Sequence, residues 1–178
     1  SWLTNEPANS TVFYGFNTSY GFVATDPNFT QTHSISLSGL NGNRLYHFQA
    51  ESCDTTGFCV RSEDQTVITL NSPPAVQGLS PNGGENITAG FVEINWTASD
   101  PDTDPITIDL YYDVDSIPSN GRFLISSGEA NDGTFLWNIQ GLQAGSYFIS
   151  IDAKSLDLSG NQTVAVTDYS DSSFEKAS

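Results

Sequence analysis

Apolar and polar residues alternate with a period of two along most of this 178-residue chain. In residues 91–115, every second position of two segments is apolar: Val92, Ile94 and Trp96, then Ile106, Ile108 and Leu110. Such alternation predicts strands with one buried face. Two prolines and three aspartates separate the segments and favour a turn. Because no segment has a convincing period of 3.6 residues, we predict an all-β fold.

The first 70 residues predict short strands separated by turns. Alternation is clean in residues 34–40, where Ile35 and Leu37 share one face and three serines occupy the other. Residues 71–76 contain two adjacent prolines and predict a stiff, extended linker. Residues 77–178 resume the strand pattern. The length of the chain allows two sandwiches of about 70 to 100 residues each, so we predict two in tandem.

The first part resembles the fibronectin type III domains of secreted microbial proteins. The motifs are W-x-T-x-E-P-A-x-S-x-V-x-Y-G from Trp2, H-S-I-S-L-S-G-L from His33, and L-Y-H-F-x-A-x-S-x-D-x-x-G from Leu45. Leu40 and Tyr46 match the spacing of the tyrosine corner in that family, in which the phenol ties a loop to the backbone. Similar domains precede the catalytic domain of purple acid phosphatases, but the metal-binding motifs of that enzyme are missing here.

The resemblance begins at the second strand of the fold, so the first sandwich is expected to lack its first strand. One explanation is that another chain donates a strand to the exposed edge. The other is that the strand lies upstream in a longer protein. Residue 1 is not a methionine and begins no signal peptide, so we expect it to mark a processing or truncation boundary. Either explanation makes this chain one piece of something larger.

The second part resembles the Kre9/Knh1-type immunoglobulin-like domain of cell-surface proteins. The motifs, in order, are S-P-N-G-G-E at residue 80, G-x-x-x-I-x-W at residue 90, G-x-x-x-W at residue 133 and S-x-S-S-F at residue 170. They consist of turn glycines and core aromatic residues. The resemblance therefore implies a surface module and specifies no reaction.

The net charge narrows the classes of molecule that this chain is expected to bind. The chain has 21 acidic and 5 basic residues and a net charge of −16, and most of the acidic surplus follows the linker. Such a field repels nucleic acid and anionic membranes. No apolar run approaches the roughly 20 residues that span a bilayer, so we expect no membrane insertion within this chain.

Two features predict a secreted or cell-surface location. Cys53 and Cys59 flank five residues, a spacing that suits a disulfide across a hairpin, although free thiols in a reducing cytosol are the alternative. The chain contains six glycosylation sequons, whereas roughly three are expected by chance. They lie at Asn9, Asn17, Asn28, Asn86, Asn95 and Asn161. A surface rich in Ser, Thr and Asn would also produce such an excess without any glycan.

Catalytic machinery is not evident in the sequence. His33 and His47 both lie on predicted strands, and neither adjoins a plausible nucleophile. The motifs G-x-S-x-G and H-E-x-x-H do not occur. We therefore predict that the chain is not an enzyme.

An acidic turn is the best candidate for a metal site. Asp100, Asp102 and Asp104 place three carboxylates at alternate positions, and Ca²⁺ prefers six to eight oxygen ligands. We expect Asp157 in the last hairpin to lie at the same end of the sandwich and to join them. The turn is not an EF-hand, because Pro105 stands where the glycine would be. The alternative is a solvated Asp/Pro turn.

Aromatic residues between positions 13 and 29 form a second candidate surface. Phe13, Phe16 and Tyr20 are the rings that we expect to stack on a sugar or on a neighbouring subunit. Phe13 is expected outside, because Val12 and Tyr14 face the other way. The alternative is that these rings are core residues.

These features predict a non-catalytic structural or adhesive module, part of a larger surface protein or filament. Its expected partners are other copies of itself, other surface proteins or polysaccharide, and calcium is the one cofactor considered. The alternative is an accessory carbohydrate-binding module of a secreted hydrolase. Exposed coplanar aromatic rings would favour sugar binding, whereas an open edge strand or self-assembly would favour a structural role.

Overall fold

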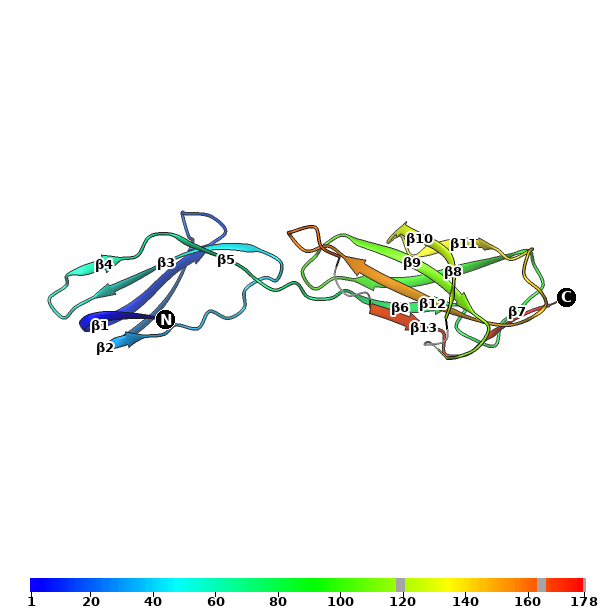
Figure 1. The fold of residues 1–178 in the computed structure, drawn as a ribbon, viewed down its shortest axis with the longest axis horizontal. Coiled ribbons are helices and arrows are strands. Elements are labelled where there is room, and N and C mark those ends of the chain that lie inside the picture. The colour runs from blue at the N-terminus through cyan, green and yellow to red at the C-terminus, as the bar shows by residue number, and fades with distance from the viewer. Residues whose placement is uncertain (118–120, 163–165, 178) are drawn as a thin grey trace. The chain divides into compact units, whose positions relative to one another are not determined.

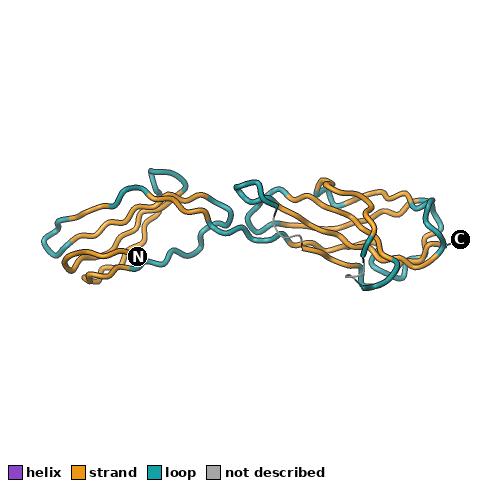
Figure 2. The backbone as a smooth tube through the Cα atoms, viewed as in Figure 1, coloured by secondary structure: helices purple, strands orange, loops and turns teal. Residues whose placement is uncertain are grey.

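A computed structural model describes residues 1–117, 121–162 and 166–177, which form β-strands joined by loops (Figure 2). The described residues contain no helix, which confirms the predicted all-β fold. They accordingly include no helix long and apolar enough to cross a membrane. The chain divides into two compact units, Ser1–Leu70 and Asn71–Ser178.

The first unit is built on one antiparallel sheet (Figure 1). Its strands are β1 (Trp2–Gly15), β2 (Phe22–His33), β3 (Leu45–Cys53), β4 (Cys59–Arg61) and β5 (Gln65–Ile68). The order is β2-β1-β3-β4, and β5 also pairs with β3. Val12 pairs with Ala50 and Tyr14 with Phe48, so these apolar side chains share one face of the sheet.

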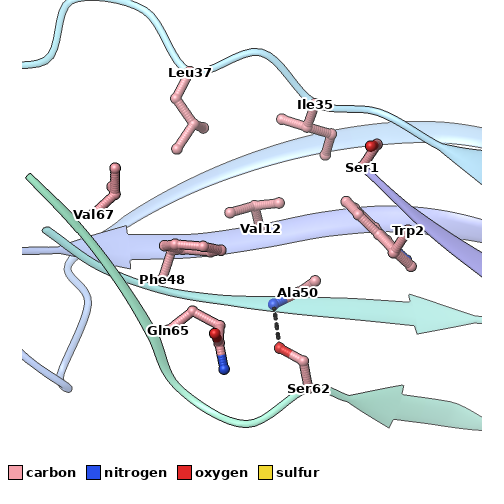
Figure 3. A pocket seen from close by; sticks show the side chains of 10 residues that line it. All are labelled: Ser1, Trp2, Val12, Ile35, Leu37, Phe48, Ala50, Ser62, Gln65 and Val67. Carbon is pink, nitrogen blue, oxygen red and sulfur yellow. Dashed lines mark hydrogen bonds between the residues drawn. The ribbon is translucent and has the colours of Figure 1, made fainter. Parts of the chain in front are cut away.

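Residues 34–40, expected to form a strand, are not hydrogen-bonded as one. Ile35 and Leu37 point toward Val12 and Phe48 (Figure 3). The three alternating serines, Ser34, Ser36 and Ser38, are exposed. The predicted alternation of faces is therefore present. Among the described residues, no backbone hydrogen bond pairs this segment with a neighbouring strand. This segment faces the apolar side of the sheet in the first unit without forming a second sheet.

The second unit is a two-sheet sandwich. The larger sheet has the order β10-β9-β12-β14-β7, with β13 also paired to β12, and the smaller has the order β11-β8-β6. The strands are β6 (Ala75–Ser80), β7 (Asn86–Ile87), β8 (Phe91–Ser99), β9 (Ile106–Asp113), β10 (Phe123–Ala130), β11 (Thr134–Asn138), β12 (Gly145–Ser155), β13 (Val166–Tyr169) and β14 (Phe174–Lys176). All pairs are antiparallel except that of β14 with β7.

The hydrophobic core of the second unit lies between its two sheets. Five of the six predicted alternating residues are buried in it, and Ile106 packs against it partly buried. The cluster consists of Val92, Ile94, Trp96, Ile108, Leu110, Ile139, Tyr147, Ile149, Ile151, Ala153 and Phe174. The ring of Trp96 is 2% exposed, and its Nε1–H donates to Asn131 Oδ1 at 3.1 Å. The indole is thus buried with its one polar group satisfied.

Both units use a buried tyrosine to hold a loop. Asn41 N–H donates to Tyr46 Oη at 3.1 Å, which is the loop contact expected of a tyrosine corner. In the second unit, Tyr147 Oη donates to the carbonyl of Gln143 at 3.0 Å. The first of these contacts was predicted from the spacing of Leu40 and Tyr46, and the second was not.

Replacing Trp96 with alanine should destabilise the second unit by about 3–5 kcal/mol, because the change removes a buried ring and leaves a cavity. The measurement is chemical unfolding followed by circular dichroism. Leu136→Ala is the control, since that side chain is 64% exposed on β11 and should change stability by less than about 0.5 kcal/mol. Equal losses in the two variants would mean that Trp96 is not central to the core.

Candidate functional site

The acidic turn between β8 and β9 brings its three aspartates together. One carboxylate oxygen from each of Asp100, Asp102 and Asp104 lies within 4.8 Å of the others. Asp100 Oδ1 accepts the backbone N–H groups of Asp102 at 2.8 Å and Asp104 at 3.3 Å, which curls the turn around this carboxylate. Thr103 completes the curl with a positive φ of 62°. The predicted grouping of these three residues is therefore present in the structure.

Asp157 occupies a different local environment from the one expected. Its Oδ1 accepts the N–H groups of Ser159 and Asn161, and its Oδ2 accepts the side-chain amide of Asn161 at 3.1 Å. The hydrogen bond from the Asn161 side chain is the main cause of a lowered Asp157 pKa. The carboxylate thus serves its own turn and is not part of the described aspartate cluster.

The three candidate aromatic residues do not share one surface. Phe16 is 51% exposed and packs against Tyr46 and Phe22, with ring centroids 4.9 and 6.5 Å away. Phe13 lies on the opposite face of β1 from Val12, as expected, and the Arg61 guanidinium covers its ring at 4.4 Å.

Tyr20 contacts a different set of side chains from Phe16. Its hydroxyl donates to Asp64 at 3.0 Å, and Asp64 also contacts His47 Nδ1 at 2.8 Å. Hence Phe13, Phe16 and Tyr20 do not form a coplanar platform for a sugar ring.

A groove of about 400 Å³ opens on the apolar face of the first unit (Figure 3). None of the side chains that line it is charged; they belong to Ser1, Trp2, Val12, Ile35, Leu37, Phe48, Ala50, Ser62, Gln65 and Val67. The side chain of Val67 is 45% exposed. Sequence reasoning located the strands beside this groove but could not show how little of the sheet is covered.

Both histidines make side-chain contacts within the first unit. His33 is 1% exposed, stacks on Trp2, and its ring nitrogens contact Ser10 Oγ at 2.8 Å and Thr4 Oγ1 at 2.9 Å. His47 contacts Asp64, and this hydrogen bond lowers the pKa of Asp64. Both histidines therefore belong to local hydrogen-bond networks of the first unit.

The two cysteines form the predicted disulfide, with a Cα–Cα distance of 4.0 Å. They pair directly across β3 and β4. The Asp54 carboxylate organises the enclosed turn by accepting hydrogen bonds from Thr56 and Phe58. The side-chain hydrogen bond from Thr56 is the main cause of a lowered Asp54 pKa.

Most of the sequon asparagines are exposed. Asn17, Asn28, Asn86 and Asn161 lie at the surface, whereas Asn9 and Asn95 are partly buried. Asn9 Oδ1 accepts the Cys53 N–H at 2.8 Å, so this side chain has a structural contact. The sequon at Asn161 includes Thr163, which lies outside the described residues.

Two ion pairs that were not predicted from the sequence join buried carboxylates to partly exposed basic side chains, on strands β9 and β12 and their neighbours. Arg122 binds Asp152 through both terminal nitrogens, at 2.8 and 2.5 Å, and its guanidinium lies 3.9 Å from the centre of the Tyr111 ring. Lys154 binds Asp109, which also accepts the Gly128 N–H at 2.9 Å. The only available signal was the presence of two of the five basic residues near acidic strands.

These contacts shift the pKa values of the paired groups. Burial favours the neutral form of Asp109, but the hydrogen bonds from Lys154 and Gly128 outweigh it and lower the Asp109 pKa. The same hydrogen bond is the main cause of a raised Lys154 pKa. A hydrogen bond to Asp152 similarly raises the pKa of Arg122.

Comparison with known proteins agrees with the resemblance of the second part. A family model described as the Kre9/KNH-like N-terminal Ig-like domain matches residues 80–172. No curated protein matches the chain.

Three solved structures align with most of this chain at low TM-scores. Fibronectin(III)-like modules of CbhA from Clostridium thermocellum align with a TM-score of 0.41 and 18% identity, covering 99% of this chain and 83% of theirs. The FN1–FN3 domains of chicken CNTN1 align with a TM-score of 0.43, and EC1-3 of Drosophila N-cadherin with 0.35, each at 13% identity over 98% of this chain. The chain spans 58% and 56% of those two proteins' chains, respectively.

Replacing both cysteines with serine should destabilise the first unit by about 2 kcal/mol, because the disulfide closes only a short loop. Chemical unfolding measures this loss. Alkylation followed by intact mass analysis is the companion measurement: without reductant the unmodified protein should gain no adduct, and after reduction it should gain two. Adducts without reduction would show free thiols.

Replacing Lys154 with methionine should destabilise the second unit by about 3 kcal/mol at pH 7, since the change leaves the Asp109 charge buried and unpaired. The lowered pKa of Asp109 contributes stability above its unfolded value of about 3.9, and this contribution is lost as pH falls through the folded pKa. The deficit of the variant should therefore shrink below about pH 4.

Unfolding curves between pH 3 and 8 measure this effect. Lys176→Met is the matched control, because among the described interactions the Lys176 ammonium contacts only the carbonyl of Ala177. A deficit that is constant with pH would contradict the role assigned to the pair.

Proposed function

Because this chain belongs to the Kre9/KNH-like N-terminal Ig-like domain family, we propose that it is a non-catalytic structural module of a secreted or cell-surface protein. The disulfide supports this location, since disulfides persist mainly in oxidising compartments. The strongly acidic composition supports a soluble, hydrated surface. The exposed sequon asparagines are candidate attachment sites for glycans.

The fibronectin type III resemblance of residues 1–70 is part of the same proposal. The contact between Asn41 and Tyr46 supports it, because a tyrosine corner of this spacing belongs to that family pattern. The two units would then be successive modules of a longer surface protein.

The observation that best supports an adhesive or filament-forming role is the open groove of the first unit. Its lining is apolar or neutral, and the adjacent residues 34–40 have backbone groups that pair with no described strand. Such a site suits an incoming strand, which would pair its backbone with this segment and bury alternate apolar side chains against Val12 and Phe48.

The occupant that fits is an uncharged, apolar strand of a neighbouring surface-protein chain. The net charge of −16 opposes close approach of two copies of this chain, whereas a neutral segment meets no such repulsion. Repeated contacts of this kind would join modules into an adhesive layer or a filament. The separate positions of Phe13, Phe16 and Tyr20 give no specific support to the alternative of a carbohydrate-binding module.

Placing charges in the groove should abolish this assembly. The variant is Ile35→Asp with Leu37→Asp, and the control is Ser36→Asp with Ser38→Asp, which adds the same charge to the exposed side of the segment. We expect the first variant to be lost from the surface of cells that express the full-length protein, and the control to be retained. Protease shaving of intact cells followed by peptide mass spectrometry measures retention.

Circular dichroism of both purified variants checks that the strands are preserved. Equal surface retention of the two variants would rule out the groove as the assembly contact. Failure to release peptides of the unmodified protein from intact cells would rule out the surface location. The purified protein can also be tested for self-association by sedimentation velocity. If it associates and only the groove variant does not, the partner is a second copy of this chain and not a different surface protein.

A further inference from the structure

The acidic turn of the second unit has the dimensions of a site for one cation. Its three carboxylate oxygens lie within 4.8 Å of one another. Oxygen ligands of Ca²⁺ lie at about 2.3–2.6 Å from the ion, so two ligands of the same ion are at most roughly 5 Å apart. One ion can therefore contact Asp100, Asp102 and Asp104 together.

A second observation, independent of this clustering, points to a missing ligand. Asp100 Oδ2 is buried and has no hydrogen-bond partner among the described residues. Its companion Oδ1 already accepts the N–H groups of Asp102 and Asp104. A carboxylate oxygen without water or a donor is costly, and a cation is the group that offsets this cost directly.

Asn71 has the same unsatisfied character. Both polar atoms of its side chain are buried without a hydrogen-bond partner among the described residues. The next residue, Ser72, donates its N–H to Asp102 Oδ2 at 2.6 Å, which places this part of the chain against the acidic turn. An amide oxygen is a regular ligand of Ca²⁺.

We propose that Asp100, Asp102, Asp104 and the side-chain oxygen of Asn71 bind one Ca²⁺ ion, with water completing the coordination. The described cluster offers oxygen ligands, and carboxylate and carbonyl oxygens suit a hard cation better than a transition metal. The ion ties residues 71 and 72 to the β8–β9 turn, so it orders the beginning of the second unit. This inference does not depend on the proposed surface function.

Calcium binding can be measured on the whole chain by isothermal titration with CaCl₂ after treatment with EGTA. We expect one site, with a dissociation constant of about 10⁻⁴ to 10⁻³ M, the range of extracellular modules. Thermal unfolding in CaCl₂ should show a higher Tm than in KCl of equal ionic strength, and MgCl₂ should produce a smaller shift.

Three variants distinguish a built site from general attraction to an acidic protein. Asp100→Asn retains an oxygen at each N–H contact but removes the charge, and Asn71→Ala removes the amide ligand. Each should weaken binding at least tenfold. Asp157→Asn is the control: it removes the same charge from an exposed turn and should bind Ca²⁺ as the unmodified protein does.

Two results would contradict the proposed calcium site. An unmodified protein that shows neither binding heat nor a calcium-specific shift in Tm would overturn the proposal. So would equal weakening by Asp157→Asn and Asp100→Asn, because that result indicates screening of the net charge alone. Circular dichroism of the calcium-free variants checks the fold, and Asn71→Ala remains as a test if Asp100→Asn does not fold.

Discussion

A sheet with one apolar face must have that face covered, and the two units meet this constraint differently. The second unit covers its larger sheet with its smaller one, and the whole of the described hydrophobic core cluster lies there. The first unit has one sheet and covers it with residues 34–40. Large apolar side chains such as Phe22 and Val67 are consequently about half exposed. Burial of apolar surface is the main favourable term in folding, so the first unit depends on additional cover far more than the second.

The two units also differ in how their described buried polar groups are satisfied. In the second unit, Asp109 and Asp152 are buried on β9 and β12, yet Lys154 and Arg122 satisfy them. In the first unit, His33 is buried against Trp2 and is held by neutral hydroxyl partners. Removing either basic partner would leave an uncompensated charge at Asp109 or Asp152.

Alternation along the chain was sufficient to predict the strands of the second unit, because a half-buried strand leaves its period in the sequence. Val92, Ile94 and Trp96 illustrate this. Alternation also predicted correctly that Ile35 and Leu37 lie on one face. It wrongly implied that this segment is a paired strand, because alternation depends on side-chain burial and not on backbone hydrogen bonding. The disulfide was predictable because its two cysteines are the only ones and are close in sequence.

Contacts between segments that are distant in the sequence were harder to predict. The three aspartates of the acidic turn are alternate residues and could be grouped from spacing alone. Asn71 lies 29 positions before Asp100, the first of them, and belongs to no motif, so only the fold places its neighbour Ser72 against Asp102. Asp157 shows the converse: its acidic character suggested a ligand, but the adjacent residues 159 and 161 already use its oxygens. A carboxylate is available to an ion only where its own turn leaves an oxygen unsatisfied, and in this chain that condition distinguishes Asp100 from Asp157.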